Sequence, residues 1–121
     1  MGVVRHIEID LTGIVSGTPE FFAVGDSASG IMASMEIEQV SVSLAGVILK
    51  MVQSNSEKTW TDVLEDEDDP SSTIEATTTA TSDAIFLASD FQEMSKIGLS
   101  IDVAGATTGT LVVYFNDRNV I

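Results

Sequence analysis

Cysteine is absent from the chain, and cationic residues are few. Without cysteine, disulfides and thiolate metal sites are excluded, so packing alone has to hold the fold together. Five lysines and arginines stand against nineteen aspartates and glutamates, which gives a formal net charge of −14 at pH 7. Nucleic acids and anionic membrane surfaces are bound through cationic groups, so we expect no nucleic acid and no membrane among the partners. A basic protein surface or a divalent cation fits this charge better, and solubility alone also accounts for it.

The chain has one histidine, His6, which limits the catalytic chemistry open to it. A Ser-His-Asp triad would have to be built on His6, which falls on the polar face of an alternating segment. The many carboxylates could supply a glycosidase pair, but among nineteen any two resemble one. Residues 105–109, Gly-Ala-Thr-Thr-Gly, lack the Lys-Ser/Thr of a phosphate-binding loop. We therefore predict that the protein is not an enzyme, and a small carboxylate hydrolase is the weakest hypothesis.

Long apolar runs are also missing. The longest, such as residues 45–49, are far too short to span a bilayer. The first residues lack the basic region and apolar block of a secretion signal. With 121 residues and 44% hydrophobic residues, the composition is globular. We expect a soluble protein whose residues 1–121 form one domain.

What the sequence does contain is alternation of polar and apolar residues with a period of two. In residues 3–11 the apolar side chains fall on one face of a strand and the polar ones on the other. The same pattern recurs over residues 35–44, 97–103 and 110–115, and residues 47–52 form another apolar strand candidate. This periodicity predicts β-strands with one buried face.

Turn signals separate these segments about every ten residues. Residues 54–58 are polar and lie between two strand candidates, which predicts a hairpin. Residues 104–109 are small and predict a second hairpin, between the last two strands. Residues 73–81 are rich in threonine and favour an extended edge segment, while residues 90–95 are a loop or a single helical turn. We predict an all-β, single-domain antiparallel β-sandwich, jelly-roll-like, with seven to eight short strands.

The acidic run 65–69 is the strongest local candidate for a functional site. Its carboxylates are the hard oxygen ligands that Ca²⁺ prefers, although the run matches no EF-hand spacing and ends at Pro70. Two other interpretations stay open, a solvated loop and a docking site for a basic partner. The candidate calcium ligands are Glu65, Asp66, Asp68 and Asp69.

Three aromatic residues are candidates for an interface or a binding surface. Trp60 begins a strand candidate, where a tryptophan is most often an anchor in the core or in an interface, and we favour the core. An exposed Trp60 would instead form a platform for a sugar ring. Phe21 and Phe22 are adjacent in a strand candidate, so they point to opposite faces and one of them points away from the core.

Residues 47–63 contain a strand, the turn 54–58 and the sequence Thr59-Trp60-Thr61-Asp62, and residues 97–115 contain two strands joined by the small residues 104–109. Together these segments resemble a group of small β-sandwich proteins from the virions of tailed bacteriophages. Ser56-Glu57 departs from the Asp or Gly that this group has in the turn. The resemblance implies a virion component, either a head decoration or cement protein or a knob or fibre module.

We therefore expect a viral structural protein located in the virion, most simply one that decorates or cements the capsid. Its partners would be capsid or other virion proteins and further copies of itself, with a homotrimer preferred because trimers suit three-fold positions of a shell. The alternative is a carbohydrate-binding or host-adhesion module with Trp60 in the sugar site. We expect no cofactor other than the candidate Ca²⁺.

Overall fold

The computed structural model describes residues 3–12, 14, 17–26, 33–39, 46–78, 84–89, 94–103 and 109–117. These residues form strands and connecting turns, and no helix among them could cross a membrane. The strands are β1 (Val3–Asp10), β2 (Glu20–Asp26), β3 (Ala33–Gln39), β4 (Ile48–Ser54), β5 (Thr61–Asp62), β6 (Glu75–Thr77), β7 (Ala84–Ser89), β8 (Lys96–Asp102) and β9 (Thr110–Asp117).

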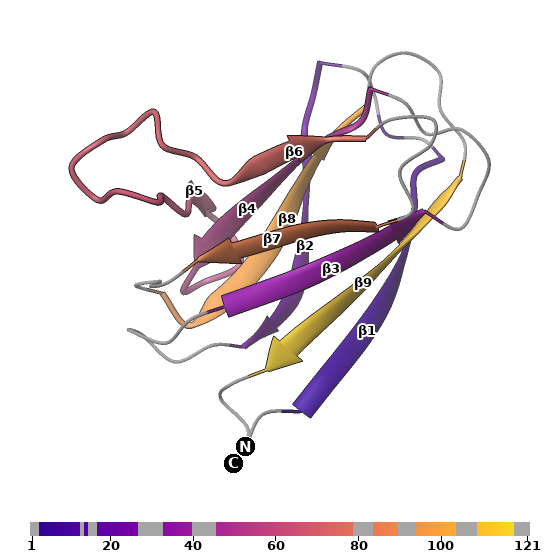
Figure 1. Cartoon of the computed structure of the whole chain (residues 1–121), viewed down its shortest axis with the longest axis horizontal. Helices are drawn as coiled ribbons and strands as arrows, with labels where there is room; N and C mark the ends of the chain where they lie inside the picture. The colour runs from indigo at the N-terminus through magenta and orange to yellow at the C-terminus, as the bar shows by residue number, and fades with distance from the viewer. Residues whose placement is uncertain are drawn as a thin grey trace.

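The strands form two antiparallel sheets that pack face to face (Figure 1). One sheet has the order β1-β9-β3-β7, and the other has the order β2-β8-β4-β5, with β6 also paired to β4. The strand pairs are nested, so that each pair encloses the next one along the sequence. β1 pairs with β9, β2 with β8, β3 with β7, and β4 with β5 and β6. The chain is thus one long folded ribbon rolled into a sandwich, which is the jelly-roll arrangement. The predicted antiparallel sandwich is confirmed.

The described residues form nine strands, where seven to eight were predicted, and two of the nine share one edge. β5 and β6 lie along the same edge of β4, at successive positions of its ladder. Between them, the N–H of Val63 donates to the carbonyl of Met51, and the N–H of Met51 donates to the carbonyl of Ile74. Residues 61–63 and 74–77 therefore act as one strand, and residues 64–73 form an insertion that leaves it. We call this insertion the acidic arm.

The core lies between the sheets and is built from the inward-facing residues of the alternating segments. In β8 the inward residues Ile97, Leu99 and Ile101 are fully buried, as predicted. The predicted inward faces of β1 and β9 are confirmed in the same way, because Ile9 and Phe115 are buried against this cluster. Each such side chain stabilises the fold by roughly 1.5–3 kcal/mol relative to an exposed one. A continuous core is the reason that the fold does not require disulfides.

The prediction of a terminal hairpin is wrong. β8 pairs with β2 and β4, while β9 pairs with β1 and β3, so residues 104–109 connect two different sheets. A short run of small residues is typical of both kinds of connection, which is why the local pattern suggested a hairpin. The predicted hairpin at residues 54–58 is confirmed, because Gln53 pairs with Thr61 across it. The predictions for residues 40–44, 79–81 and 90–93 lie outside the described residues.

Candidate interaction surfaces

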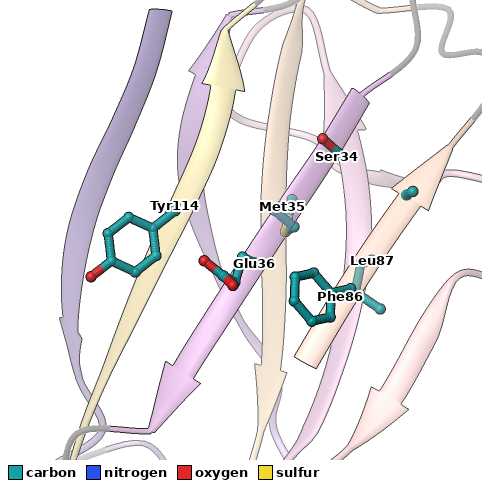
Figure 2. Close-up of a pocket in the computed structure, with 7 residues that line it drawn as sticks. Ser34, Met35, Glu36, Phe86, Leu87 and Tyr114 are labelled. Carbon is teal, nitrogen blue, oxygen red and sulfur yellow. The ribbon is translucent and has the colours of Figure 1, made fainter. Parts of the chain in front are cut away.

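The outer face of the sheet β1-β9-β3-β7 carries a row of ring-bearing side chains. The strand registers place His6 beside Tyr114, Tyr114 beside Glu36, and Glu36 beside Phe86. The rings of His6 and Tyr114 are 6.0 Å apart between centroids and tilted by 39°. Figure 2 shows Tyr114, Glu36 and Phe86 on three neighbouring strands. We call the outward side chains of this sheet the Phe86 face.

An open groove of ≈ 350 Å³ lies on the Phe86 face. Its lining residues come from β3, β7 and β9, with Phe86 and Tyr114 contributing the aromatic surface. Phe86 is 71% exposed, more than any other large hydrophobic side chain among those that the structure describes. A phenylalanine exposed to this extent suggests a contact surface, since burying it would remove its apolar area from water.

Three glutamates set the electrostatics of the Phe86 face. The Tyr114 hydroxyl donates to Oε2 of Glu38 at 3.4 Å. The negative charge of Glu38 raises the pKa of Tyr114 above its usual value of 10.0, and loss of solvation, the hydrogen bond, Glu36 and Glu8 raise it further. The face is therefore anionic at neutral pH, and a negatively charged ligand would be repelled from it.

The outer face of the second sheet carries an aromatic pair, Phe21 and Trp60. Their rings are nearly parallel, 2° apart, with 6.4 Å between centroids. Trp60 packs over Gly98 of β8, where a Cβ would lie 2.6 Å from Cζ3 of the indole. Gly98 lies between the core residues Ile97 and Leu99, so the missing side chain would point outward. The indole thus fills the space left by this glycine.

The structure corrects the prediction that Trp60 belongs to the core. Trp60 is half-buried and covers the outside of the sheet, because Gly98 leaves room for it there. The two adjacent phenylalanines do point to opposite faces: Phe22 packs against the core, and Phe21 is 47% exposed. The structure brings Phe21 and Trp60 together and leaves Phe22 on the other side of the sheet. Their role as an interface stays a prediction.

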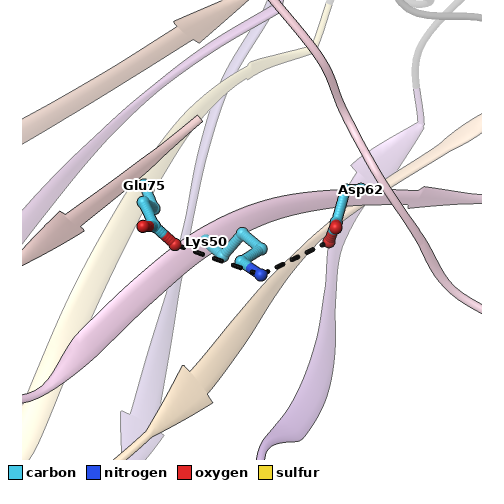
Figure 3. Close-up of polar contacts among 3 residues, drawn as sticks. All are labelled: Lys50, Asp62 and Glu75. Carbon is cyan, nitrogen blue, oxygen red and sulfur yellow. Dashed lines mark ion pairs between the residues drawn. The ribbon is translucent and has the colours of Figure 1, made fainter. Parts of the chain in front are cut away.

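Charged residues lie on the same sheet as the aromatic pair. The Lys50 ammonium group lies 3.8 Å from Asp62 and 4.0 Å from Glu75 (Figure 3). All three residues are partly exposed, so each ion pair contributes about 0–1 kcal/mol to stability. The two carboxylates come from the two halves of the interrupted strand, and Lys50 of the neighbouring strand β4 lies between them. This arrangement offers charged hydrogen-bonding groups near an aromatic surface.

The acidic arm holds the four candidate calcium ligands. The carboxylate of Asp66 accepts from the N–H of Asp68, and that of Asp69 accepts from the N–H and the hydroxyl of Ser71. The two hydrogen bonds from Ser71 lower the pKa of Asp69. Among the residues that the structure describes, no three His, Cys, Asp or Glu side chains gather into a group that could hold a metal ion. The geometry thus lends the calcium site no support, and it stays a prediction.

Phe86 and Tyr114 were not among the candidate interface residues predicted from the sequence. The signal was present, because Ile85 and Leu87 flank Phe86 and face inward, so that alternation places Phe86 outside. The short run of residues 84–88 is entirely apolar and conceals this pattern. Tyr114 stands similarly between two core residues of β9. No family model, no curated protein and no solved structure matches the chain.

Proposed function

We propose that the protein is a structural component of a virion, and specifically one that decorates or cements the head of a tailed bacteriophage. The observation that carries the proposal is the nested strand pairing, β1–β9, β2–β8 and β3–β7, within a four-stranded and a five-stranded sheet. Jelly rolls of this kind are recurrent in viral capsid domains and also in lectins. The fold supports the proposal by analogy, and the resemblance of residues 47–63 and 97–115 to phage sandwich proteins supports it as well.

The surfaces also support a protein that works through contacts with other proteins. Phe86 and Phe21 are exposed on the two opposite outer faces of the sandwich, so the molecule can be contacted from both sides. The acidic arm and the glutamates of the Phe86 face favour basic patches of a shell protein. Attraction between opposite charges would orient the chain on the capsid, and burial of the apolar side chains would hold it there. The preferred homotrimer stays a prediction of the sequence.

The test is to look for the chain on particles. Virions of the phage whose genome encodes it are purified, and the copies of the chain per major capsid protein are counted by quantitative mass spectrometry. Cryo-electron microscopy of the same particles then locates the density. We expect a stoichiometric number of copies on the outside of the head. Absence from purified virions would overturn the proposal, and density confined to the tail would move the protein to a different virion structure.

A carbohydrate-binding module is the second candidate, and the Phe21–Trp60 pair is the observation that favours it. Sugar rings stack on aromatic side chains, and the neighbouring Lys50, Asp62 and Glu75 could accept or donate hydrogen bonds to hydroxyl groups. A glycan array on the wild-type chain, Trp60→Ala and Phe86→Ala separates the two functions. Binding that Trp60→Ala abolishes and Phe86→Ala preserves would establish the adhesion module. Glycan binding that is lost in both variants would indicate an effect of the substitutions on the fold rather than a sugar site at Trp60.

A further inference from the structure

β7 differs from every other described strand in its charge. Its sequence, Ala-Ile-Phe-Leu-Ala-Ser, contains no Asp, Glu, Lys or Arg, whereas each of the other eight strands contains at least one. A strand without charge is unexpected in a chain with a net charge of −14. The same strand also carries Phe86, whose side chain is 71% exposed.

β7 is an edge of its sheet. It pairs with β3 along one side, and within the described part of the chain no strand pairs with its other side. In an antiparallel sheet, alternate residues of an edge strand direct their N–H and C=O groups away from the sheet. Six residues at about 3.4 Å per residue give an edge about 20 Å long. This edge is a template for one further strand.

The other edges of the two sheets carry features that discourage such pairing. β1 exposes His6, Glu8 and Asp10, and β2 has an irregular register between Ala23 and Gly25. The remaining edge is interrupted between β5 and β6, where the acidic arm leaves the ladder. Charges, bulges and short strands all hinder addition of a strand. β7 has none of these features, and its pairing with β3 is regular over its length.

We propose that β7 pairs in antiparallel fashion with β7 of a second copy of this chain, so that the order β3-β7-β7′-β3′ runs through a two-fold dimer. Charge selects a second copy as the occupant. A basic partner would be drawn to the acidic faces and would gain nothing from an uncharged strand. Another copy, with the same net charge of −14, can approach closely only where charge is lacking.

The nearest like charges in this dimer are far enough apart for salt to screen most of their repulsion. Glu36 lies beside Phe86 on β3, so the two Glu36 residues are separated by three strand spacings. That distance is about 14 Å, compared with a Debye length of about 8 Å at physiological ionic strength. Phe86 and the exposed Ala88 lie on the outer face of β7, where cross-strand neighbours of the partner can cover them. The dimer does not depend on the proposed virion function.

Light scattering coupled to size exclusion, over a series of protein concentrations, tests the dimer. We expect the wild-type chain to approach the mass of two chains as concentration rises. Phe86→Glu places a charge on β7 and a like charge opposite it in the dimer, so its dissociation constant should rise at least about tenfold. The matched control is Phe21→Glu, the same change at an exposed phenylalanine of β2, which should dimerise as the wild type does. Circular dichroism confirms that both variants are folded.

Salt dependence adds a second readout. Higher salt screens repulsion between two acidic chains, so it should strengthen the dimer, whereas it would weaken binding to a basic partner. A wild-type chain that stays monomeric at every concentration and salt level would overturn the proposal. So would a dimer that Phe86→Glu leaves intact, or one that both glutamate variants weaken equally. A mass of three chains would replace the two-fold dimer by the homotrimer that the sequence suggests.

Discussion

The indole of Trp60 fills the space on the outside of the second sheet that Gly98 leaves open by having no side chain. A Cβ on Gly98 would lie 2.6 Å from Cζ3 and 2.8 Å from Cη2 of the indole. The pair explains why a tryptophan in a polar stretch of the sequence is half-buried although it is not in the core. The contact also holds the indole in the position where the Phe21 ring stacks on it.

The first prediction concerns this pair. Gly98→Ala should lower the free energy of unfolding by about 1–3 kcal/mol, since the added methyl group collides with the indole and with the carbonyl oxygen of Phe22. In a Trp60→Ala background the same change should cost less, because the largest obstacle is gone. Urea unfolding of the four proteins in this double-mutant cycle measures the difference. Equal costs in both backgrounds would mean that the indole does not occupy the space above Gly98.

A second glycine, Gly25 of β2, leaves space for an aromatic ring on the core side of the sheet. A Cβ at Gly25 would lie 2.6 Å from Cδ2 of Phe115, a ring that is completely buried. Gly25→Ala should therefore destabilise the protein by about 1–3 kcal/mol or more, because a core ring has less room to move than a surface indole. Ala23→Ser, on the exposed face of the same strand, should change stability by less than about 0.5 kcal/mol. Thermal unfolding of both variants makes the comparison.

The part of the fold that the sequence predicts is the part set by local periodicity. Inward faces such as Ile97, Leu99 and Ile101 follow from alternation, because each residue's side is decided by its immediate neighbours. The pairing of strands is decided by residues far apart, so alternation could not show that residues 104–109 cross between sheets. It could not show that Val63 and Ile74 meet at Met51 either.

The candidate surfaces also divide into features set by local alternation and features set by residues far apart in the sequence. Because Phe21 and Phe22 are adjacent in a strand, it was predictable that one of them points outward, although not which one. The outward orientation of Phe86 was available from the same rule. The position of Trp60 was not, because it depends on a glycine in a strand distant in the sequence. Nor does composition reveal that β7 is an edge, since its partner β3 precedes it by a long segment of chain.

The third prediction is that the acidic arm can be removed. Both ends of the arm are anchored through Met51, so the ladder along β4 does not need residues 65–72. Replacing them with Asn-Gly, a two-residue hairpin turn between Leu64 and Thr73, should leave the fold intact and remove five carboxylates. We expect the unchanged β-sheet spectrum by circular dichroism and cooperative unfolding. Loss of cooperative unfolding would show that the arm stabilises the sandwich.

Calcium provides the fourth prediction. The carboxylates of Asp66 and Asp69 already accept hydrogen bonds within the arm, and no metal-binding group is gathered among the described residues. We therefore expect excess Ca²⁺ or EDTA to leave the melting temperature unchanged. The arm-deleted chain is the control for effects of ionic strength. An increase in melting temperature with Ca²⁺ that is confined to the wild type would establish the site that the sequence suggested.

The fifth prediction uses Tyr114, the single tyrosine of the chain, whose ionisation can be followed by the ultraviolet absorbance of phenolate. Because Glu38 raises its pKa, the titration midpoint in the folded protein should lie above 10.0, the usual value. A raised pKa in the folded state means that the associated stability is present below pH 10.0 and is lost as the pH rises through the folded midpoint.

Glu38→Gln removes the largest cause of this shift and should move the midpoint down towards 10.0. Glu8→Gln, on the far side of Tyr114, removes the smallest contribution and should move it less. The chain unfolded in denaturant supplies the unshifted reference. If the two variants shift the midpoint equally, the field of the whole acidic face, rather than its neighbour Glu38, controls the hydroxyl group of Tyr114.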